Sequence, residues 1–440
     1  MPLLLQRLVW LLAGEGVARV TRLLTAVVLS RTLGPYEFGV AAIVLASDEL
    51  VRVASRNGIG IKVIQAEPEQ LDRTCQGVYR INWVISIALA VLQVLIAKPL
   101  ALYFSYPPLQ AMLTVLALVY CIYPLAMVHV YRVQRRQDMK LTASIYGAQV
   151  GADNILTAVL ALAGCGVWSV IIPKVLVAPL WVYCYRKAEQ WHFEPKAVFM
   201  PFAEVWQFSR DVLLVEVLKV VRGSIDRLFI GAVLGVEAVG IYFFAVNAGS
   251  GLSLALIGAF NTLIMPHLCQ QKLHEQRQQQ SKIKAVQDGK SMLRKRYKQS
   301  LGKFVLFIVP IILLQLALAP WYVPVVFGQH WQFAVPVLMV LCMAVIFHGL
   351  IEVGTQVLRA HNKTRFDLML STVFAVVYMG ALGIGCQFDI QAVAIATLLV
   401  QITFFIVAYL LINHSGFIDS ELDMEPGLIT KNNKITGATS

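Results

Sequence analysis

A chain of 440 residues with 58% hydrophobic and 14% charged residues has a mean hydropathy of +0.69, whereas an ordinary soluble domain carries about 25% charged residues. The net charge of +12 is concentrated between long apolar runs. This composition excludes a soluble enzyme, a disordered chain and a nucleic-acid-binding protein with a soluble core, and it favours an all-α integral membrane protein.

Apolar runs of about 20 residues can cross a bilayer as helices. Such runs recur along the chain and predict twelve transmembrane helices, at residues 8–33, 38–65, 77–98, 109–132, 141–163, 166–186, 204–234, 239–266, 301–326, 332–359, 366–387 and 391–413. We expect the first run to be a retained helix and not a signal peptide, because Glu15, Arg19 and Arg22 interrupt it before any convincing cleavage site.

Lys and Arg are distributed unequally over the predicted connections. They gather near residues 132–140, 186–196, 267–300 and 359–365, whereas the six connections on the opposite side contain neither residue. Cytoplasmic loops carry the excess of positive charge. We therefore expect a multi-pass protein with both termini in the cytoplasm.

The helix pattern predicts two six-helix lobes. The expected parts are an N-terminal lobe at 1–200, the first hairpin of a C-terminal lobe at 201–266, a basic Gln-rich cytoplasmic loop at 267–300, the rest of the C-terminal lobe at 301–413, and a cytoplasmic tail at 414–440. The basic loop is either a solvated segment that contacts lipid headgroups or a segment that binds nucleic acid or anionic lipid. Our interpretation is the former, without nucleic acid.

An internal repeat supports the two lobes. Leu33, Gly34 and Gly39 follow the first helix, and Leu234, Gly235 and Gly240 follow the seventh with the same spacing and an offset of 201 residues. Because six helices separate the copies, both have the same orientation in the membrane. The lobes are then parallel repeats around a central cavity.

Charged residues lie inside several predicted helices with helical spacing. Because an ionised side chain near the bilayer centre costs about 2.5 to 3.5 kcal/mol on insertion scales, each is a candidate for function. The bases predicted to bind substrate are Arg19, Arg22, Arg52, Lys219 and Arg222. The acids predicted either to couple transport to an ion or to pair with bases are Glu15, Asp48, Asp153, Glu216, Asp226 and Glu352.

We call these rows of charged residues, which share one face of a helix, charge stripes. Two interpretations of them stay open. The side chains line an aqueous cavity, or each acid neutralises the base one helical turn away and fastens the helices together. Basic residues dominate the stripes, which favours an anionic passenger, because the arginine fork matches phosphate oxygens. Asp153 has no base one turn away in its own helix and is the candidate for an unpaired proton site.

The chain shows no signature of catalysis or metal binding. Its seven cysteines form no CxxC pair, and no HExxH motif, nucleophile elbow or complete phosphate-binding loop occurs. We expect no catalytic residue, metal or cofactor; a proton or sodium ion is a candidate coupling ion.

Short motifs distributed over residues 10–410 resemble the polysaccharide or lipid-linked oligosaccharide flippases of the multidrug/oligosaccharidyl-lipid/polysaccharide exporter superfamily. They are RTLGPYEFG at 31–39, NGIG at 57–60, RVQRR at 132–136, GCGVWS at 164–169, DRLFIG at 226–231 and FGQHW at 327–331. Asn57 and the long Gln-rich loop depart from the family pattern.

The resemblance implies two six-helix lobes around a cationic cavity built partly from helices 1, 2 and 7. It also implies translocation of a polyprenyl-diphosphate-linked oligosaccharide from the inner to the outer leaflet, by alternating access, for cell-surface polysaccharide biosynthesis. The expected location is the bacterial inner membrane, and the expected partners are the lipid-linked glycan, membrane lipids and other polysaccharide assembly proteins. The alternatives are a drug or cation antiporter of the same superfamily, or a membrane-embedded glycan polymerase or glycosyltransferase.

Overall fold

The computed structural model describes residues 2–55, 59–195, 223–250, 297–360 and 364–413, together with parts of 213–220 and 251–261. Over these residues the chain is helical with short turns, and no strand is formed. The described residues divide into two compact units. The first contains the residues up to Asn247 together with Pro320–Val335, and the second contains Ala248–Ala319 and the residues from Pro336 onward.

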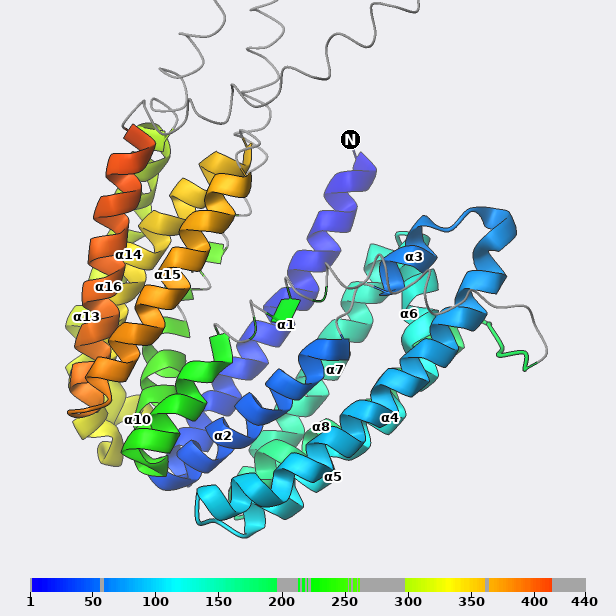
Figure 1. The fold of residues 1–440 in the computed structure, drawn as a ribbon, viewed down its shortest axis with the longest axis horizontal. Coiled ribbons are helices and arrows are strands. Elements are labelled where there is room, and N and C mark those ends of the chain that lie inside the picture. The colour runs from blue at the N-terminus through cyan, green and yellow to red at the C-terminus, as the bar shows by residue number, and fades with distance from the viewer. Residues whose placement is uncertain are drawn as a thin grey trace, which may run out of the picture. The chain divides into compact units, whose positions relative to one another are not determined.

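In the first unit, α1 packs against α7, α7 against α8, and α4 against α5 (Figure 1). Its elements are α1 (Pro2–Thr32), α2 (Pro35–Arg52), η1 (Val53–Ser55), α3 (Ile59–Gln65), η2 (Pro68–Gln70), α4 (Leu71–Tyr103), α5 (Pro108–Ile122), α6 (Pro124–Arg135), α7 (Met139–Leu162), α8 (Trp168–Ala188), a helix over 223–234, α10 (Val236–Ala245), η4 (Val323–Phe327) and η5 (Gln329–Ala334). The π-helical η3 (Val246–Ser250) contains the boundary between the units.

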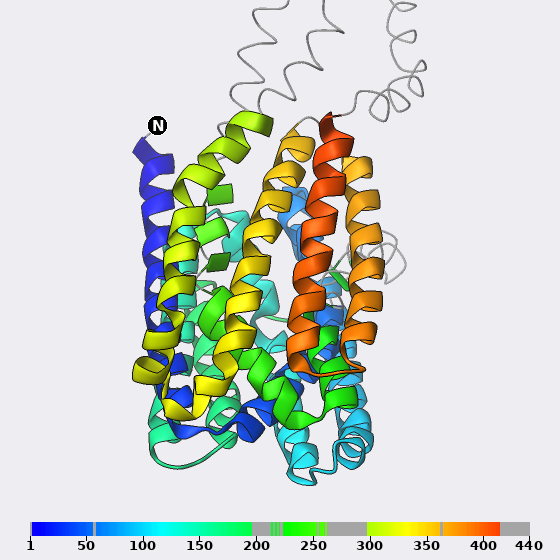
Figure 2. The same ribbon diagram turned by 90° about the vertical axis from the view of Figure 1, so that its left-hand side faces the viewer.

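The second unit is a group of helices that lie side by side (Figure 2). After a helical segment at 297–307 come α13 (Val309–Tyr322), α14 (Val335–Ala360), α15 (Thr364–Gly385) and α16 (Ile390–Asn413). The end of α13 after Ala319 and the first residue of α14 belong to the first unit. The core of the second unit is apolar and contains the fully buried rings of Tyr297 and Phe304. A methyl group at Gly349 would come within 2.3 Å of the Phe304 ring, so the ring lies directly against the backbone of α14 and would have to shift to admit a side chain there.

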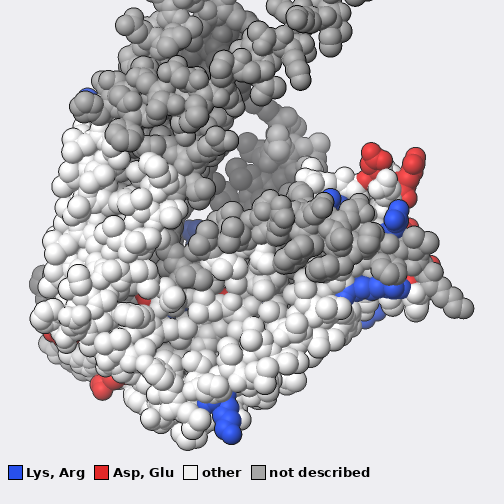
Figure 3. All heavy atoms as spheres, in the orientation of Figure 1, with Lys and Arg blue, Asp and Glu red and all other residues white. Residues whose placement is uncertain are grey.

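Six helices among the described residues are long and apolar enough to cross a membrane, and a seventh span results if α5 and α6 are counted together. The visible face over α4 and α5 is nearly free of charge along its middle, and the charged groups lie toward its ends (Figure 3). A continuous uncharged surface of this kind suits lipid and not water. The predicted class, an all-α integral membrane protein, is thus confirmed, and the described helices are consistent with the twelve-helix, two-lobe arrangement.

Four helices predicted to be continuous are interrupted. The predicted helix 38–65 stops at Arg52, where the Ser55 hydroxyl donates to the Arg52 carbonyl at 2.7 Å, and it restarts at Ile59. The predicted helix 109–132 bends by 51° before Pro124, because proline has no N–H group and its ring clashes with the preceding turn. The predicted helices 239–266 and 301–326 contain the π-helical segments η3 and η4.

Small residues set the contact between α1 and α7. A methyl group at Gly14 would come within 2.7 Å of the Ala143 carbonyl oxygen, and Gly147 faces Gly14. Further along the same pair of helices, the Thr25 hydroxyl donates to the Asn154 carbonyl at 2.9 Å, and Asn154 Nδ2 donates to the Thr21 hydroxyl at 3.0 Å. Close backbones and interhelical hydrogen bonds are the usual means of helix association in lipid.

The two copies of the glycine motif meet each other. A methyl group at Gly39 would lie 1.9 Å from the Val236 carbonyl oxygen, and one at Gly240 would lie 1.8 Å from the Pro35 carbonyl oxygen. The offset of 201 residues that relates Gly39 to Gly240 also relates Pro35 to Val236. The contact between α2 and α10 is therefore isologous: the same surface occurs on both sides of a local two-fold axis.

Aromatic and polar contacts fasten residues 320–335 to the first unit. The buried Trp331 ring stacks on Phe244 with centroids 3.9 Å apart, and its Nε1 donates to the Ser30 carbonyl at 2.8 Å. The Arg31 guanidinium donates to the Val326 and Val325 carbonyls at 2.8 and 2.6 Å. The Arg31 bonds satisfy carbonyl groups of the π-helical segment η4, and the Trp331 bond satisfies a carbonyl in the last turn of α1.

Of the predicted parts of the chain, the lobe boundary at residue 200, most of the Gln-rich loop at 267–300 and the tail at 414–440 lie outside the described residues. They stay predictions.

Candidate anion-binding site

A buried carboxylate and a partly exposed guanidinium lie one turn apart at the end of α2. Asp48 Oδ2 is 3.6 Å from Arg52 Nε, and the side chains are 6% and 35% exposed. The Tyr120 hydroxyl of α5 donates to Asp48 Oδ1 at 2.9 Å and also lies 3.2 Å from Gln93 Oε1 of α4. Gln93 Nε2 donates to the Leu113 carbonyl at 3.1 Å. Three helices thus fix the carboxylate, whereas the guanidinium is held less firmly.

A second pair joins α7 to α8. Lys174 Nζ lies 3.4 Å from Asp153 Oδ2, with the side chains 31% and 25% exposed. The interpretation of Asp153 as an unpaired proton site is therefore wrong. No base stands one turn away in its own helix, but the neighbouring helix supplies one.

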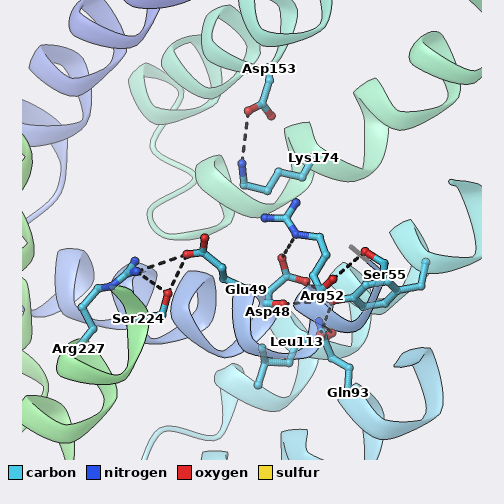
Figure 4. A network of polar contacts seen from close by, with 11 residues as sticks. Asp48, Glu49, Arg52, Ser55, Gln93, Leu113, Asp153, Lys174, Ser224 and Arg227 are labelled. Carbon is cyan, nitrogen blue, oxygen red and sulfur yellow. Dashed lines mark hydrogen bonds and ion pairs between the residues drawn. The ribbon is translucent and has the colours of Figure 1, made fainter. Parts of the chain in front are cut away.

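The bend between α5 and α6 lies between these two pairs. The Tyr123 side chain lies close enough to Arg52, Asp48 and Asp153 to interact electrostatically with each of them, and it lies near the Gln149 side chain of α7. In Figure 4 the Arg52 guanidinium and the Lys174 ammonium extend toward the same region from α2 and α8. Two cationic groups from different helices therefore extend toward one region of the first unit.

A third cluster links α2 to the helix over 223–234. Glu49 Oε2 accepts from the Ser224 hydroxyl at 3.0 Å and from the Arg227 guanidinium at 3.4 Å. Arg227 also donates to Ser224 Oγ at 2.9 Å. The neighbouring Asp226 accepts from the Tyr242 hydroxyl of α10 at 3.1 Å and from the Arg227 backbone N–H at 2.8 Å. Figure 4 shows Glu49, Ser224 and Arg227 beside the Asp48–Arg52 pair.

The structure places the other predicted residues as follows. Glu15 and Arg19 form a loose pair at 3.9 Å on an exposed face of α1, and Arg22 is exposed on the same helix. Glu216 is partly buried in the seventh predicted helix, and Glu352 is partly buried in α14 of the second unit. Lys219 and Arg222 lie outside the described residues.

The interpretation that each acid neutralises the base one turn away describes two of the stripes, those on α1 and α2. Within the network of Figure 4, each of Arg52, Lys174 and Arg227 lies beside a carboxylate. The described network is therefore close to electrically neutral. The predicted excess of basic over acidic side chains around the cavity therefore depends on residues outside this network, namely Arg22, Lys219 and Arg222.

Sequence reasoning missed Lys174, Glu49 and Arg227. Lys174 was detectable, because it is a lysine inside a predicted span, between Pro173 and Pro179. Glu49 and Arg227 each follow a predicted acid directly, but a stripe defined by steps of three and four residues passes over an adjacent position. Their pairing needs the contact between two helices and has no signal in the sequence.

Chemically, the site offers charge and hydrogen bonds. Among the described residues no group of three or more His, Cys, Asp or Glu side chains is arranged to hold a metal ion. Charged side chains within the membrane-spanning part of a protein that are loosely paired and partly exposed are typical of transport pathways. Fold and site together define a multi-span membrane protein of the transporter class.

Comparisons with known proteins narrow this class. The sequence profile described as "Polysaccharide biosynthesis protein" matches residues 28–336, so the chain belongs to that family. An uncharacterized membrane protein in the cps region of Klebsiella pneumoniae is 22% identical, over 82% of this chain and 71% of its own length. The lipopolysaccharide biosynthesis protein WzxC of Escherichia coli is 21% identical, over 91% of this chain and 77% of its own.

Two solved structures share the fold. The lipid II flippase MurJ, in an inward closed conformation, superposes with a TM-score of 0.68 at 12% identity, over 92% of this chain and 90% of MurJ. An inward-facing multidrug resistance transporter of the MATE family superposes with a TM-score of 0.69 at 14% identity, over 95% of this chain and 100% of the transporter. One of these proteins is a flippase and the other a transporter, which agrees with the resemblance of the sequence motifs to flippases of the exporter superfamily.

Proposed function

We propose that the protein is a flippase that moves a polyprenyl-diphosphate-linked oligosaccharide from the inner to the outer leaflet during cell-surface polysaccharide biosynthesis. The observation that carries the proposal is the placement of two partly exposed bases. Lys174 lies within α8, which is long and apolar enough to span a membrane, and Arg52 at the end of α2 extends toward the same region.

The physical task explains why such bases are needed. A diphosphate and its sugars lose water on entering hydrocarbon, and an unpaired polar group there costs several kcal/mol. Partly exposed bases replace that water with charge-assisted hydrogen bonds, while the lipid tail stays in the bilayer. Arg19, Arg22, Lys219 and Arg222 are proposed to add to the same cationic surface.

The family and its relatives support this substrate. The matching profile concerns polysaccharide biosynthesis, WzxC is named for lipopolysaccharide biosynthesis, and MurJ is a lipid II flippase. We propose alternating access between two lobes, in the bacterial inner membrane, with both termini in the cytoplasm. The six predicted acids are candidates for coupling to a proton or sodium ion: Glu15, Asp48, Asp153, Glu216, Asp226 and Glu352. Other polysaccharide assembly proteins are candidate partners.

The test is to delete the gene for this protein and to measure how the lipid-linked glycan is distributed between the inner and outer leaflets of the membrane. We expect the glycan to accumulate on the inner leaflet and to reach the outer leaflet again when the wild-type gene is restored. Arg22→Ala and Arg52→Gln should restore export incompletely. Normal export in the deletion strain, with no related gene present, would reject the function.

A drug or cation antiporter is the second candidate, because the MATE transporter has an equally similar fold. This alternative predicts that purified protein in liposomes exchanges a cationic drug for protons or sodium and ignores the lipid-linked glycan. Transport of the cation without transport of the glycan would favour it.

A further inference from the structure

Lys174 lies in α8, outside the predicted helices 8–33, 38–65 and 204–234 that carry the charge stripes. We propose that Lys174 is a substrate-binding residue, which together with Arg52 holds the diphosphate group of the lipid carrier. The proposal rests on the proposed function, because it names the base that the headgroup contacts.

The position of Lys174 is unfavourable unless it is used. It lies in α8, which is long and apolar enough to span a membrane. Lys174 is the seventh residue of this 21-residue helix, and a lysine inside such a helix is costly, up to about 2.5 to 3.5 kcal/mol at the helix centre on insertion scales. An apolar residue would suit the packing of α8 better, so packing alone does not account for the ammonium.

The bonds of the two bases are incomplete. Charge-assisted N–H to O contacts are about 2.7 to 2.9 Å long, whereas the Lys174–Asp153 and Arg52–Asp48 contacts are 3.4 and 3.6 Å. Arg52 Nε and Asp153 Oδ1 are both buried, and neither makes a hydrogen bond to any residue that the structure describes. A buried donor and a buried acceptor without partners indicate a site shaped for something else.

A phosphorylated sugar satisfies both atoms. Phosphate oxygens accept from Arg52 Nε and from the Lys174 ammonium, and a sugar hydroxyl next to the diphosphate donates to Asp153 Oδ1. Asp48 keeps its bond from Tyr120 when Arg52 turns to the phosphate, so only Asp153 needs a new partner. Asp153 therefore has two roles: it holds the ammonium in place until the headgroup arrives, and it then accepts from the sugar hydroxyl.

The direct test measures binding by the purified full-length protein in detergent. The probes are undecaprenyl diphosphate, undecaprenyl monophosphate, inorganic pyrophosphate and phosphatidylglycerol. We expect undecaprenyl diphosphate to bind most tightly to the wild type, and Lys174→Gln to weaken it about 10- to 100-fold, as for loss of one charged hydrogen bond. Lys174→Arg should retain most of the affinity. The matched control is Lys187→Gln in the last turn of α8, which should bind as the wild type does.

Two double variants separate binding from folding. Lys174→Gln with Asp153→Asn leaves no uncompensated charge and should fold, yet still bind weakly. Lys174→Asp with Asp153→Lys restores the ion pair but moves the base to α7, and it should also bind weakly. Restored binding in the exchanged variant would show that the pair has only a structural role and would overturn the inference.

The remaining outcomes are also decisive. Unchanged binding of undecaprenyl diphosphate by Lys174→Gln overturns the inference alone. An equal loss of phosphatidylglycerol binding shows a general lipid site and overturns it too, and tighter binding of inorganic pyrophosphate than of the lipid identifies a free anion as the ligand. Failure of the wild type to bind undecaprenyl diphosphate overturns the proposed function itself.

Discussion

The crossing of α2 and α10 gives a prediction whose size follows from the structure. Gly39→Ala places a methyl carbon 1.9 Å from the Val236 carbonyl oxygen and 2.8 Å from its carbon. Carbon and oxygen atoms that are not bonded stay about 3.3 Å apart even in the closest favourable contacts. The two backbones must therefore separate by about 1.4 Å, since neither side of the contact is a flexible side chain.

Overpacking of this kind costs about 1 to 3 kcal/mol. Part of it is offset, because alanine favours a helix over glycine by up to about 1 kcal/mol. We expect the midpoint of thermal unfolding of the purified protein, followed by tryptophan fluorescence, to fall by about 2 °C or more. Gly240→Ala should act in the same direction, because its methyl carbon would lie 1.8 Å from the Pro35 carbonyl oxygen.

Two comparisons test the reasoning. Gly16→Ala is the matched control, since nothing lies within 4 Å of its added methyl group, and it should leave the midpoint unchanged or raise it. Gly39→Ala combined with Gly240→Ala should cost less than the sum of the single changes, because one separation of the helices relieves both clashes. A Gly39→Ala protein as stable as the wild type, or strictly additive effects, would refute the two-fold contact.

The remaining predictions concern single polar contacts. Tyr120→Phe removes the donor to buried Asp48 and should lower the free energy of unfolding by about 1 to 3 kcal/mol in denaturation experiments; an unchanged value would mean that water replaces the hydroxyl. Glu49→Gln and Arg227→Gln in a double-mutant cycle should show a coupling energy of about 0.5 to 3 kcal/mol, and zero coupling would exclude a stabilising pair. Trp331→Phe loses the Nε1 bond to a backbone carbonyl of α1 and should increase proteolysis near residues 320–335; an unchanged cleavage pattern would contradict that anchoring role.

Much of the fold was predictable from the sequence. Apolar length and the spacing of charges gave the helices, because a segment in lipid must satisfy its own backbone hydrogen bonds and so has no alternative to a helix. The breaks were less predictable. Pro124 was visible in the sequence, but the π-helical segment at 246–250 was not, because no residue type marks it.

The site divides in a similar way. Intramembrane charges such as Asp48 and Arg52 are conspicuous in any hydropathy profile, and helical spacing pairs them correctly. Asp153 was misread for the same reason: spacing reports neighbours within one helix, whereas Lys174 comes from the next one.

The sequence by itself determined that the protein is helical, membrane-embedded and built from a repeat, since those properties depend on composition and on local periodicity. Only the tertiary structure decided which charges meet and that Gly39 and Gly240 face each other's helices. Contacts between helices depend on the rotation and crossing of their axes, which side-chain shapes from distant parts of the chain set together.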